Sequence, residues 1–198
     1  MSRNADNQRI AKNTLLLYFR MLFTMAVSLY TSRVVLNALG VEDFGIYNVV
    51  GGIVVMLSFL NGAMAGATQR FLNIELGRKD EKQLKKVFST SLIIHIGVSI
   101  VVLLLAETIG LWFLNTCMNI SENRMHAANW VYQYSVAAFI VSVISVPYNA
   151  TIIAHEKMSA FAYISILEVI LKLAIVFILI VAPFDKLILY AFLIFLVG

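Results

Sequence analysis

The chain has 198 residues, of which 61% are hydrophobic and only 13% carry a charge. Soluble domains carry roughly 25% charged residues and cover their exterior with polar side chains, so this composition excludes a soluble globular fold. The net charge of +4 does not indicate a nucleic-acid partner, because the basic residues cluster beside apolar blocks, as a membrane orientation signal does.

Several protein classes are disfavoured by what the sequence lacks. Cys117 is the only cysteine, so we expect neither an intrachain disulfide nor a cysteine metal site. Residues 1–12 are polar and show no cleavage site after a short apolar core, so we expect no cleaved signal peptide. The sequence contains no HExxH, GxxxxGK[ST] or GxSxG motif, so we expect no enzymatic activity, no bound metal and no cofactor.

Apolar segments of bilayer length predict an all-α, polytopic transmembrane bundle over residues 1–198. We expect five complete spans and an incomplete sixth. The sixth begins near Leu187 and reaches Gly198 after about 18 Å, less than the roughly 30 Å of a bilayer core. We therefore expect a fragment of a longer, transporter-like protein. The expected spans are residues 13–36, 45–67, 87–113, 127–154, 158–182 and the incomplete 187–198.

The loop charges predict the orientation of these spans. Basic residues gather in alternate connections, which places the amino terminus and the 75–88 loop in the cytoplasm. We expect residues 75–88 to form a short interfacial helix whose lysines meet anionic headgroups, the alternative being a docking site for a cytoplasmic partner. The basic residues expected inside are Arg3, Arg9, Lys12, Arg70, Arg78, Lys79, Lys82, Lys85, Lys86 and Lys157, against Arg124 and Lys186 outside.

Two features predict how the spans are shaped and packed. Gly62 and Gly66 form a GxxxG step, which lets helix backbones approach closely, and we expect it to pack within the bundle rather than in a dedicated dimer interface. Pro147 removes a backbone hydrogen bond inside the fourth span, so a kink is expected there. The kink serves either as a hinge or only as a feature of shape.

Charged residues inside the spans are the strongest functional signal. A guanidinium near the bilayer centre costs at least about 2.5–3.5 kcal/mol, so it usually faces a bundle interior or a wet cavity. We predict a cationic cavity formed by Arg20, Lys172 and Arg33, which suggests an anionic cargo. Glu168 precedes Lys172 by four residues and is placed to pair with it. Arg20 then needs either Glu168 or an anionic ligand.

Three further ionisable residues lie within the expected spans. Arg33 and Glu107 both fall near the outer edge and could pair across helices or extend to the interface. His95 lies about 12 Å from the basic side at helical rise. We expect it to be a hydrogen-bonded core residue, the alternative being a proton relay.

Three stretches of the sequence are similar to bacterial oligosaccharide (O-antigen) flippases of polysaccharide biosynthesis. These belong to the multidrug/oligosaccharidyl-lipid/polysaccharide exporter superfamily, and the resemblance covers essentially the whole chain. The stretches are Ser32-Arg-Val-Val-Leu-Asn-Ala-Leu-Gly40 with Glu42-Asp-Phe-Gly-Ile-Tyr-Asn48, then Gln69-Arg-Phe71, then Ser145-Val-Pro-Tyr-Asn-Ala150 with Ala154-His-Glu-Lys-Met158.

The resemblance implies two six-helix lobes around a central cavity, this chain being the first lobe, incomplete in its last helix. The implied cargo is an oligosaccharide on polyprenyl pyrophosphate, moved to the outer leaflet of the bacterial inner membrane for surface polysaccharide or lipopolysaccharide synthesis, alongside membrane lipids and polysaccharide polymerisation machinery. One rival is a multidrug or organic-cation antiporter, although residues 13–36 and 45–67 contain no Asp or Glu. The other rival is a non-transporting membrane scaffold.

Overall fold

The computed structural model describes the backbone of residues 2–198 and the side chains of residues 14–198. Over these residues the chain is helical and contains no strand, so the predicted all-α fold is confirmed. The elements are α1 (Ser2–Val55), the 3₁₀ turn η1 (Met56–Ser58), α2 (Phe59–Arg78), α3 (Glu81–Leu105), the π-helix η2 (Ala106–Gly110), α4 (Leu111–Cys117), α5 (Glu122–Ala154), α6 (Met158–Val181) and α7 (Lys186–Val197).

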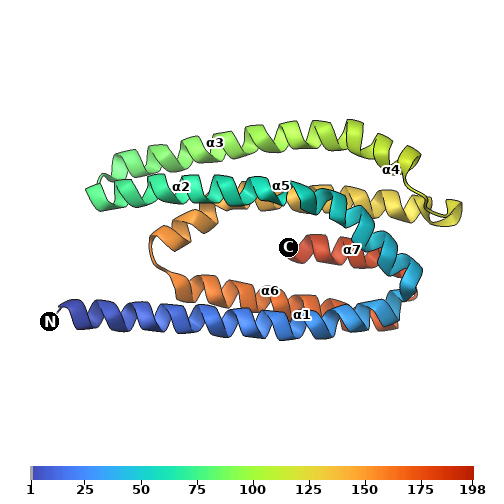
Figure 1. The fold of residues 1–198 in the computed structure, drawn as a ribbon, viewed down its shortest axis with the longest axis horizontal. Coiled ribbons are helices and arrows are strands. Elements are labelled where there is room, and N and C mark those ends of the chain that lie inside the picture. The colour runs from blue at the N-terminus through green and yellow to red at the C-terminus, as the bar shows by residue number, and fades with distance from the viewer. Residues whose placement is uncertain (1) are drawn as a thin grey trace.

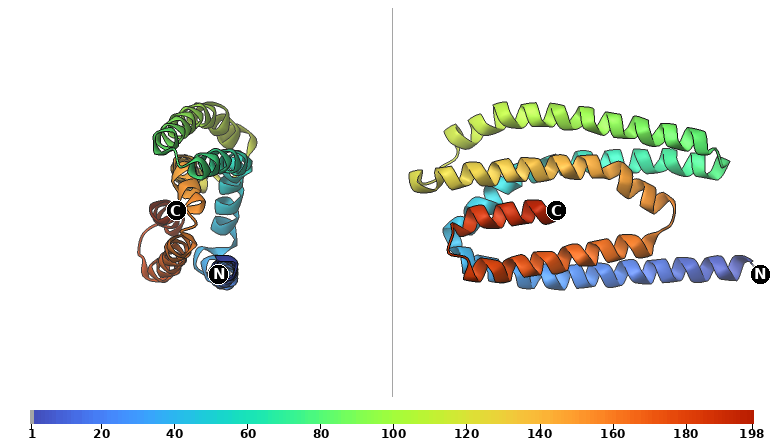
Figure 2. Two further views of the ribbon diagram at one scale, coloured as in Figure 1. Left: turned by 90° about the vertical axis from the view of Figure 1, so that its left-hand side faces the viewer. Right: turned by 180° about the vertical axis from the view of Figure 1, so that it is seen from behind.

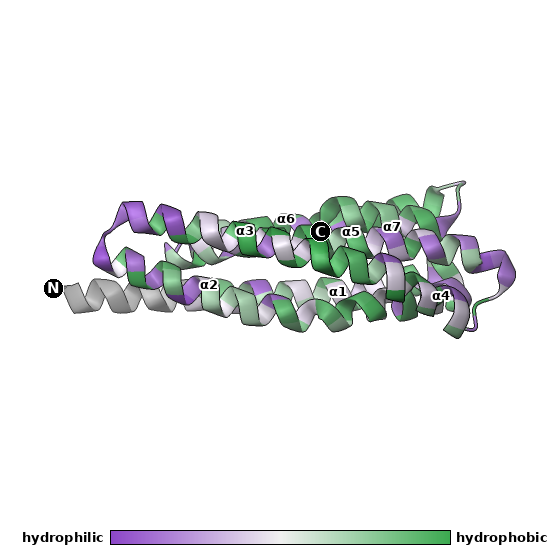
Figure 3. Ribbon diagram, turned by 90° about the horizontal axis from the view of Figure 1, so that it is seen from above, coloured by the Kyte–Doolittle hydropathy of each residue, from purple (hydrophilic) through white to green (hydrophobic). Residues whose placement is uncertain are grey.

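The helices run side by side along one long axis (Figures 1 and 2). The helices α2, α3 and α5 lie on one side, α1 and α6 on the other, and α7 lies between α5 and α6 (Figure 1). Within residues 2–198, four helical stretches are long and apolar enough to cross a membrane: Thr14–Arg78, Glu81–Cys117, Glu122–Ala154 and Met158–Val181. Figure 3 shows an apolar middle between hydrophilic ends, as a membrane-spanning bundle requires.

The stretch Thr14–Arg78 is broken at Gly40, whose backbone has φ 80° and ψ 169°. This region of backbone space is open essentially only to glycine. Beyond Gly40 the chain crosses the end of the bundle, and α2 then runs back in the opposite direction to the first part of α1 (Figure 1). The segments predicted as separate spans at 13–36 and 45–67 therefore lie on either side of this break.

The prediction of an interfacial helix over residues 75–88 is wrong. The helix α2 continues to Arg78 and ends at Lys79, which has a left-handed backbone and donates its N–H to the Leu76 carbonyl over 3.1 Å. Asp80 then caps α3 by accepting the Gln83 N–H over 3.0 Å. These two capping signals join α2 and α3 by a tight turn and place the lysines in the first turns of α3.

The expectation that the GxxxG step packs within the chain is also wrong. A side chain added at Gly62 or Gly66 would meet nothing within 4 Å. The helix α2 instead packs through a different face, where Thr68 and Leu72 are buried. The glycine face is turned away from the bundle because α2 packs against α3 and α5 through that other face.

The end of α5 that follows Pro147 tilts away from the rest of the helix and toward α6 (Figure 1). A proline inside a helix has no N–H to donate and crowds the carbonyl four residues earlier, which bends the helix. The Thr151 hydroxyl donates to the Pro147 carbonyl over 2.8 Å in this last part of α5. The tilt brings the chain across to the start of α6.

The long helix formed by α3 and α4 is interrupted by the π-helix η2. The Tyr132 hydroxyl on α5 donates to the Ala106 carbonyl in η2 over 2.9 Å. Gly110 allows this close approach, because a Cβ at that position would collide with the Tyr132 hydroxyl. The π-helix therefore contributes one of the hydrogen bonds between this long helix and α5.

The turns between helices lie at the two ends of the bundle (Figure 1), and these two ends carry different charged residues. We call the end with the α2–α3 and α5–α6 turns the basic end, because it carries Arg78, Lys79, Lys82 and Lys157. We call the other end the acidic end, because the Gly40 region, the α4–α5 turn and the α6–α7 turn carry Glu42, Asp43, Glu122 and Asp185.

Candidate functional site

Arg20 lies on α1, half-buried against α6. Its Nη1 donates to the Ser165 hydroxyl over 3.2 Å, and its guanidinium carbon lies 4.6 Å from the centre of the Phe161 ring. No carboxylate among the side chains of residues 14–198 forms an ion pair with it. Arg20 is therefore held by a hydroxyl and an aromatic face, with its charge left uncompensated by these residues.

Glu168 and Lys172 form the pair that their i,i+4 spacing indicates. The Lys172 Nζ lies 2.6 Å from Glu168 Oε1, with the two side chains 36% and 38% exposed. Because Lys172 engages Glu168, the carboxylate is not the partner of Arg20. Two of the three basic residues of the predicted cavity thus differ: Lys172 is paired with a carboxylate of its own helix, whereas Arg20 is not.

Arg33 and Glu107 do not form the cross-helix pair that was one of the two expectations for them. Glu107 accepts a hydrogen bond from Gln133 Nε2 on α5 over 3.2 Å. Arg33 is exposed on α1, in the other layer of the bundle, and makes no hydrogen bond or ion pair with any side chain of residues 14–198. The sequence places both residues near the outer edge, but they belong to α1 and η2, which have little contact with each other, so they do not meet.

His95 is buried in α3, with 2% of its surface exposed. Its Nδ1 lies 2.7 Å from the Ser91 carbonyl and must carry the proton to make this bond. Its Nε2 has no partner in the described part of the chain, nor has the buried Ser99 hydroxyl one turn further on. This geometry fits a hydrogen-bonded core residue, and the described residues supply no next carrier for a proton relay.

Arg124 is the centre of a polar cluster at the acidic end, where it pairs with two carboxylates. Its Nε donates to Asp43 Oδ1 over 2.7 Å, and a second contact joins its Nη2 to Asp43 Oδ2. Its Nη1 donates to Asp185 Oδ2 over 2.8 Å, while Asp185 also caps α7 by accepting the Leu187 N–H over 3.0 Å. We call Asp43, Arg124 and Asp185 the Arg124 clasp. It ties α1, α5 and α7 together.

From the sequence, Arg124 is interpreted only as an orientation signal, although the charges of the neighbouring loops indicate its partners. The three loops expected on the same side of the membrane each carry one member: Asp43, Arg124 and Asp185. Opposite charges on neighbouring loops are candidates for pairing, and an arginine can serve two carboxylates at once.

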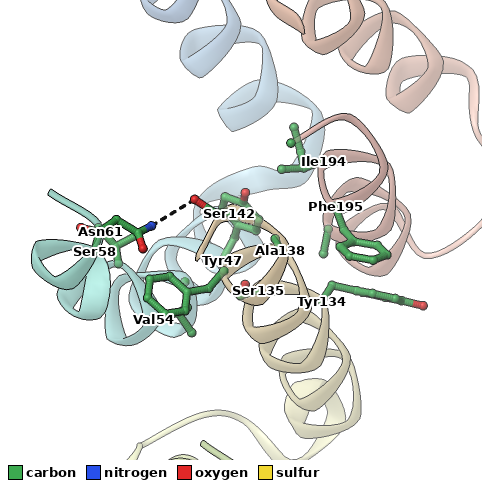
Figure 4. Close-up of a pocket in the computed structure, with 15 residues that line it drawn as sticks. Tyr47, Val54, Ser58, Asn61, Tyr134, Ser135, Ala138, Ser142, Ile194 and Phe195 are labelled. Carbon is green, nitrogen blue, oxygen red and sulfur yellow. Dashed lines mark hydrogen bonds between the residues drawn. The ribbon is translucent and has the colours of Figure 1, made fainter. Parts of the chain in front are cut away.

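A pocket of about 320 Å³ lies between α1, α2, α5 and α7 (Figure 4). Asn61 and Ser58 stand on one side, Tyr134 and Phe195 on the other, with Ser142 between them (Figure 4). None of the residues that line it is charged. Its polar lining consists of Tyr47, Ser58, Asn61, Tyr134, Ser135 and Ser142.

The pocket contains one hydrogen bond between helices and one unpaired acceptor. Asn61 Nδ2 on α2 donates to the Ser142 hydroxyl oxygen on α5 over 3.1 Å. Asn61 Oδ1 is buried and has no partner in the described part of the chain. Ser135 is instead satisfied by its own helix, since its hydroxyl donates to the Val131 carbonyl over 2.8 Å. The sequence marks Asn61 as polar within a span, but the pairing depends on packing.

No family model, no curated protein and no solved structure matches the chain. Function is therefore inferred from the residue motifs and the side-chain geometry. Among the side chains of residues 14–198, no group of three or more His, Cys, Asp or Glu could hold a metal ion.

Proposed function

We propose that this chain is a component of a flippase that moves polyprenyl-pyrophosphate-linked oligosaccharide across the bacterial inner membrane, for surface polysaccharide or lipopolysaccharide synthesis. One observation carries the proposal. The guanidinium of Arg20 lies in an apolar helix and is not compensated by any described carboxylate, while the nearby carboxylate of Glu168 is engaged by Lys172.

The contacts of Arg20 leave it suited to a phosphate ligand. An arginine carries five N–H donors in a planar fork, and the only hydrogen bond that Arg20 makes to a described residue uses Nη1. The remaining donors can contact two oxygens of one phosphate group, and such charge-assisted bonds are roughly twice as strong as neutral ones. A low local dielectric strengthens the attraction further.

The charge distribution supports loading from the cytoplasmic side. The basic end is the cytoplasmic end under the positive-inside rule, which gives the amino terminus the same side. Arg20 lies about 10 Å from that end at helical rise, within the cytoplasmic half of the bilayer. A pyrophosphate headgroup that enters from the inner leaflet meets Arg20 early on its path.

The two rival functions fit the side-chain contacts less well. An organic-cation antiporter needs an available carboxylate, whereas Glu168 is paired with Lys172 and Glu107 accepts from Gln133. A scaffold does not require an uncompensated Arg20. A charge inside the bilayer costs free energy, and such residues usually have a functional role.

The test is export of surface glycan by cells that carry Arg20→Ala in the otherwise intact protein. We expect export to fall about tenfold or more, since one or two charge-assisted hydrogen bonds are lost, with membrane abundance near normal. Arg20→Lys should retain part of the activity because the charge persists. Arg78→Ala is the matched control, since Arg78 is an exposed arginine at the basic end. Normal export from an abundant Arg20→Ala protein would refute the proposal.

A further inference from the structure

The pocket between α1, α2, α5 and α7 gathers polar side chains inside an otherwise apolar bundle. Polar groups within membrane-spanning segments usually face a bundle interior or a water-filled cavity, and they mark ligand pathways. Here hydroxyl and amide groups from η1, α2 and α5 converge on one pocket (Figure 4). The convergence from separate elements indicates a built site rather than scattered polar residues.

The hydrogen-bonding groups of the pocket match a ligand rich in hydroxyls. Asn61 Oδ1 is a buried acceptor without a partner, and buried polar groups in proteins nearly always have one. Ser142 accepts from Asn61 and keeps its own O–H available to donate. A ligand hydroxyl both donates and accepts, so it can satisfy both groups, whereas an apolar ligand can satisfy neither.

The opposite wall of the pocket is aromatic. Tyr134 stacks on Phe195, with ring centres 6.1 Å apart and planes at 23°. Tyr134 also stacks on Trp130, at 5.6 Å and 28°. Because Tyr134 is already stacked on these two rings, the wall offers a ligand an apolar aromatic surface rather than a free stacking face. The C–H groups of a sugar ring can pack on such a surface while its hydroxyls reach the hydrogen-bonding groups.

The pocket carries no charge of either sign among its lining residues. A carboxylate or an ammonium group would lose its hydration there without gaining an opposite charge. We infer that this pocket binds an uncharged sugar unit, held by Asn61 and Ser142 beside the aromatic wall at Tyr134. This rests on the proposed function, because it assigns the pocket to the sugar part of the same cargo whose pyrophosphate is assigned to Arg20.

The two tryptophans of the chain allow a direct binding test. Trp130 stacks on Tyr134, so its fluorescence reports on the pocket, and Trp112→Phe leaves it as the only indole. The protein is placed in lipid nanodiscs free of sugar-based detergent. The probes are N-acetylglucosamine and methyl galactoside as neutral sugars, glucuronate as an anion, and glucosamine and tetraphenylphosphonium as cations. We expect a saturable response to at least one neutral sugar and none to the charged probes.

Substitutions then locate the site. Ser142→Ala and Asn61→Ala should each weaken sugar binding about three- to tenfold, the effect of losing one neutral hydrogen bond. Ser145→Ala is the control for Ser142, because the Ser145 hydroxyl bonds to the Val141 carbonyl of its own helix. Asn48→Ala is the control for Asn61, because Asn48 bonds to the Phe44 carbonyl. Both controls should bind sugar as the parent protein does.

The outcomes separate this inference from the proposed function. No saturable response to either neutral sugar overturns the sugar site, as does binding of tetraphenylphosphonium that is weakened by Ser142→Ala. Sugar binding unaffected by either pocket substitution also overturns it. Sugar binding is measured independently of export. If Arg20→Ala loses export but Trp130 fluorescence shows no response to neutral sugars, only the sugar site is refuted. Normal export in Arg20→Ala refutes the phosphate role even where sugars bind.

Discussion

Arg124 Nε donates to Asp43 Oδ1 over 2.7 Å and joins the first turn of α5 to the segment beyond the Gly40 break. Asp43 is only 7% exposed, whereas the Arg124 side chain is 29% exposed, so the carboxylate is the buried partner of this ion pair. Removing one partner of such a pair is costly because the other charge stays buried without compensation. The pair therefore fixes where the chain lies after it turns at Gly40.

The first prediction concerns the stability of the Arg124 clasp. Arg124→Ala should lower the free energy of unfolding by about 2 kcal/mol or more, because Asp43 loses its partner and Asp185 loses a second contact. The measurement is denaturant unfolding of the purified protein in detergent. Arg78→Ala is the control, since its exposed pair with Glu75 should contribute under about 1 kcal/mol. Equal losses in the two variants would contradict the clasp.

The second prediction separates the partners of Glu168. A double-mutant cycle between Lys172→Met and Glu168→Gln should give a measurable coupling energy, because the two side chains lie 2.6 Å apart. The cycle between Arg20→Ala and Glu168→Gln should be additive within about 0.5 kcal/mol, since Arg20 bonds to Ser165 instead. The readout is again unfolding in detergent. Strong coupling between Arg20 and Glu168 would mean that Arg20 is a structural ion-pair residue.

The third prediction concerns the π-helix. Gly110→Ala should destabilise the protein by about 1–3 kcal/mol, because the added methyl group collides with the Tyr132 ring and hydroxyl. Gly97→Ala is the matched control on α3, where an added Cβ meets nothing within 4 Å. That change should be neutral or stabilising by up to about 1 kcal/mol, since alanine favours helix more than glycine does. Thermal unfolding compares the two, and similar values for both would exclude the tight contact.

The fourth prediction concerns orientation. Cys117 is exposed near the acidic end, so an impermeant thiol reagent should label it from outside intact cells. In a Cys117→Ser background, Lys82→Cys should be labelled only after the cells are permeabilised, because Lys82 lies at the basic end. Labelling of Lys82→Cys in intact cells would reverse the orientation, and with it the proposed direction of loading.

Much of the fold follows from local properties of the sequence. Length and hydropathy identify the apolar helices because both are properties of the segment itself and do not depend on how it packs against other helices. The ends of the helices are less accessible from hydropathy alone. The helix α3 begins at Glu81 because Asp80 caps it, which extends it several residues beyond the apolar segment predicted to start at 87.

The candidate site depends on packing and is less predictable. The pairing of Glu168 with Lys172 follows from helix geometry within one segment. The contact of Arg20 with Ser165 depends on how α1 is rotated against α6, which no local pattern determines. The separation of Arg33 from Glu107 shows the same limit, because equal depth in the membrane does not place two residues on the same side of a bundle.

Gly40 also matters for how the chain is made. The helical stretch from Thr14 to Arg78 has 65 residues, which would measure about 98 Å if straight, against a bilayer core of about 30 Å. If this stretch were one straight helix, the apolar turns beyond the bilayer core would be exposed to water. The left-handed backbone of Gly40 lets the stretch enter the bilayer as a hairpin, with Glu42 and Asp43 at its tip. The backbone conformation at Gly40 thus divides a stretch far longer than one bilayer crossing into two segments that run in opposite directions.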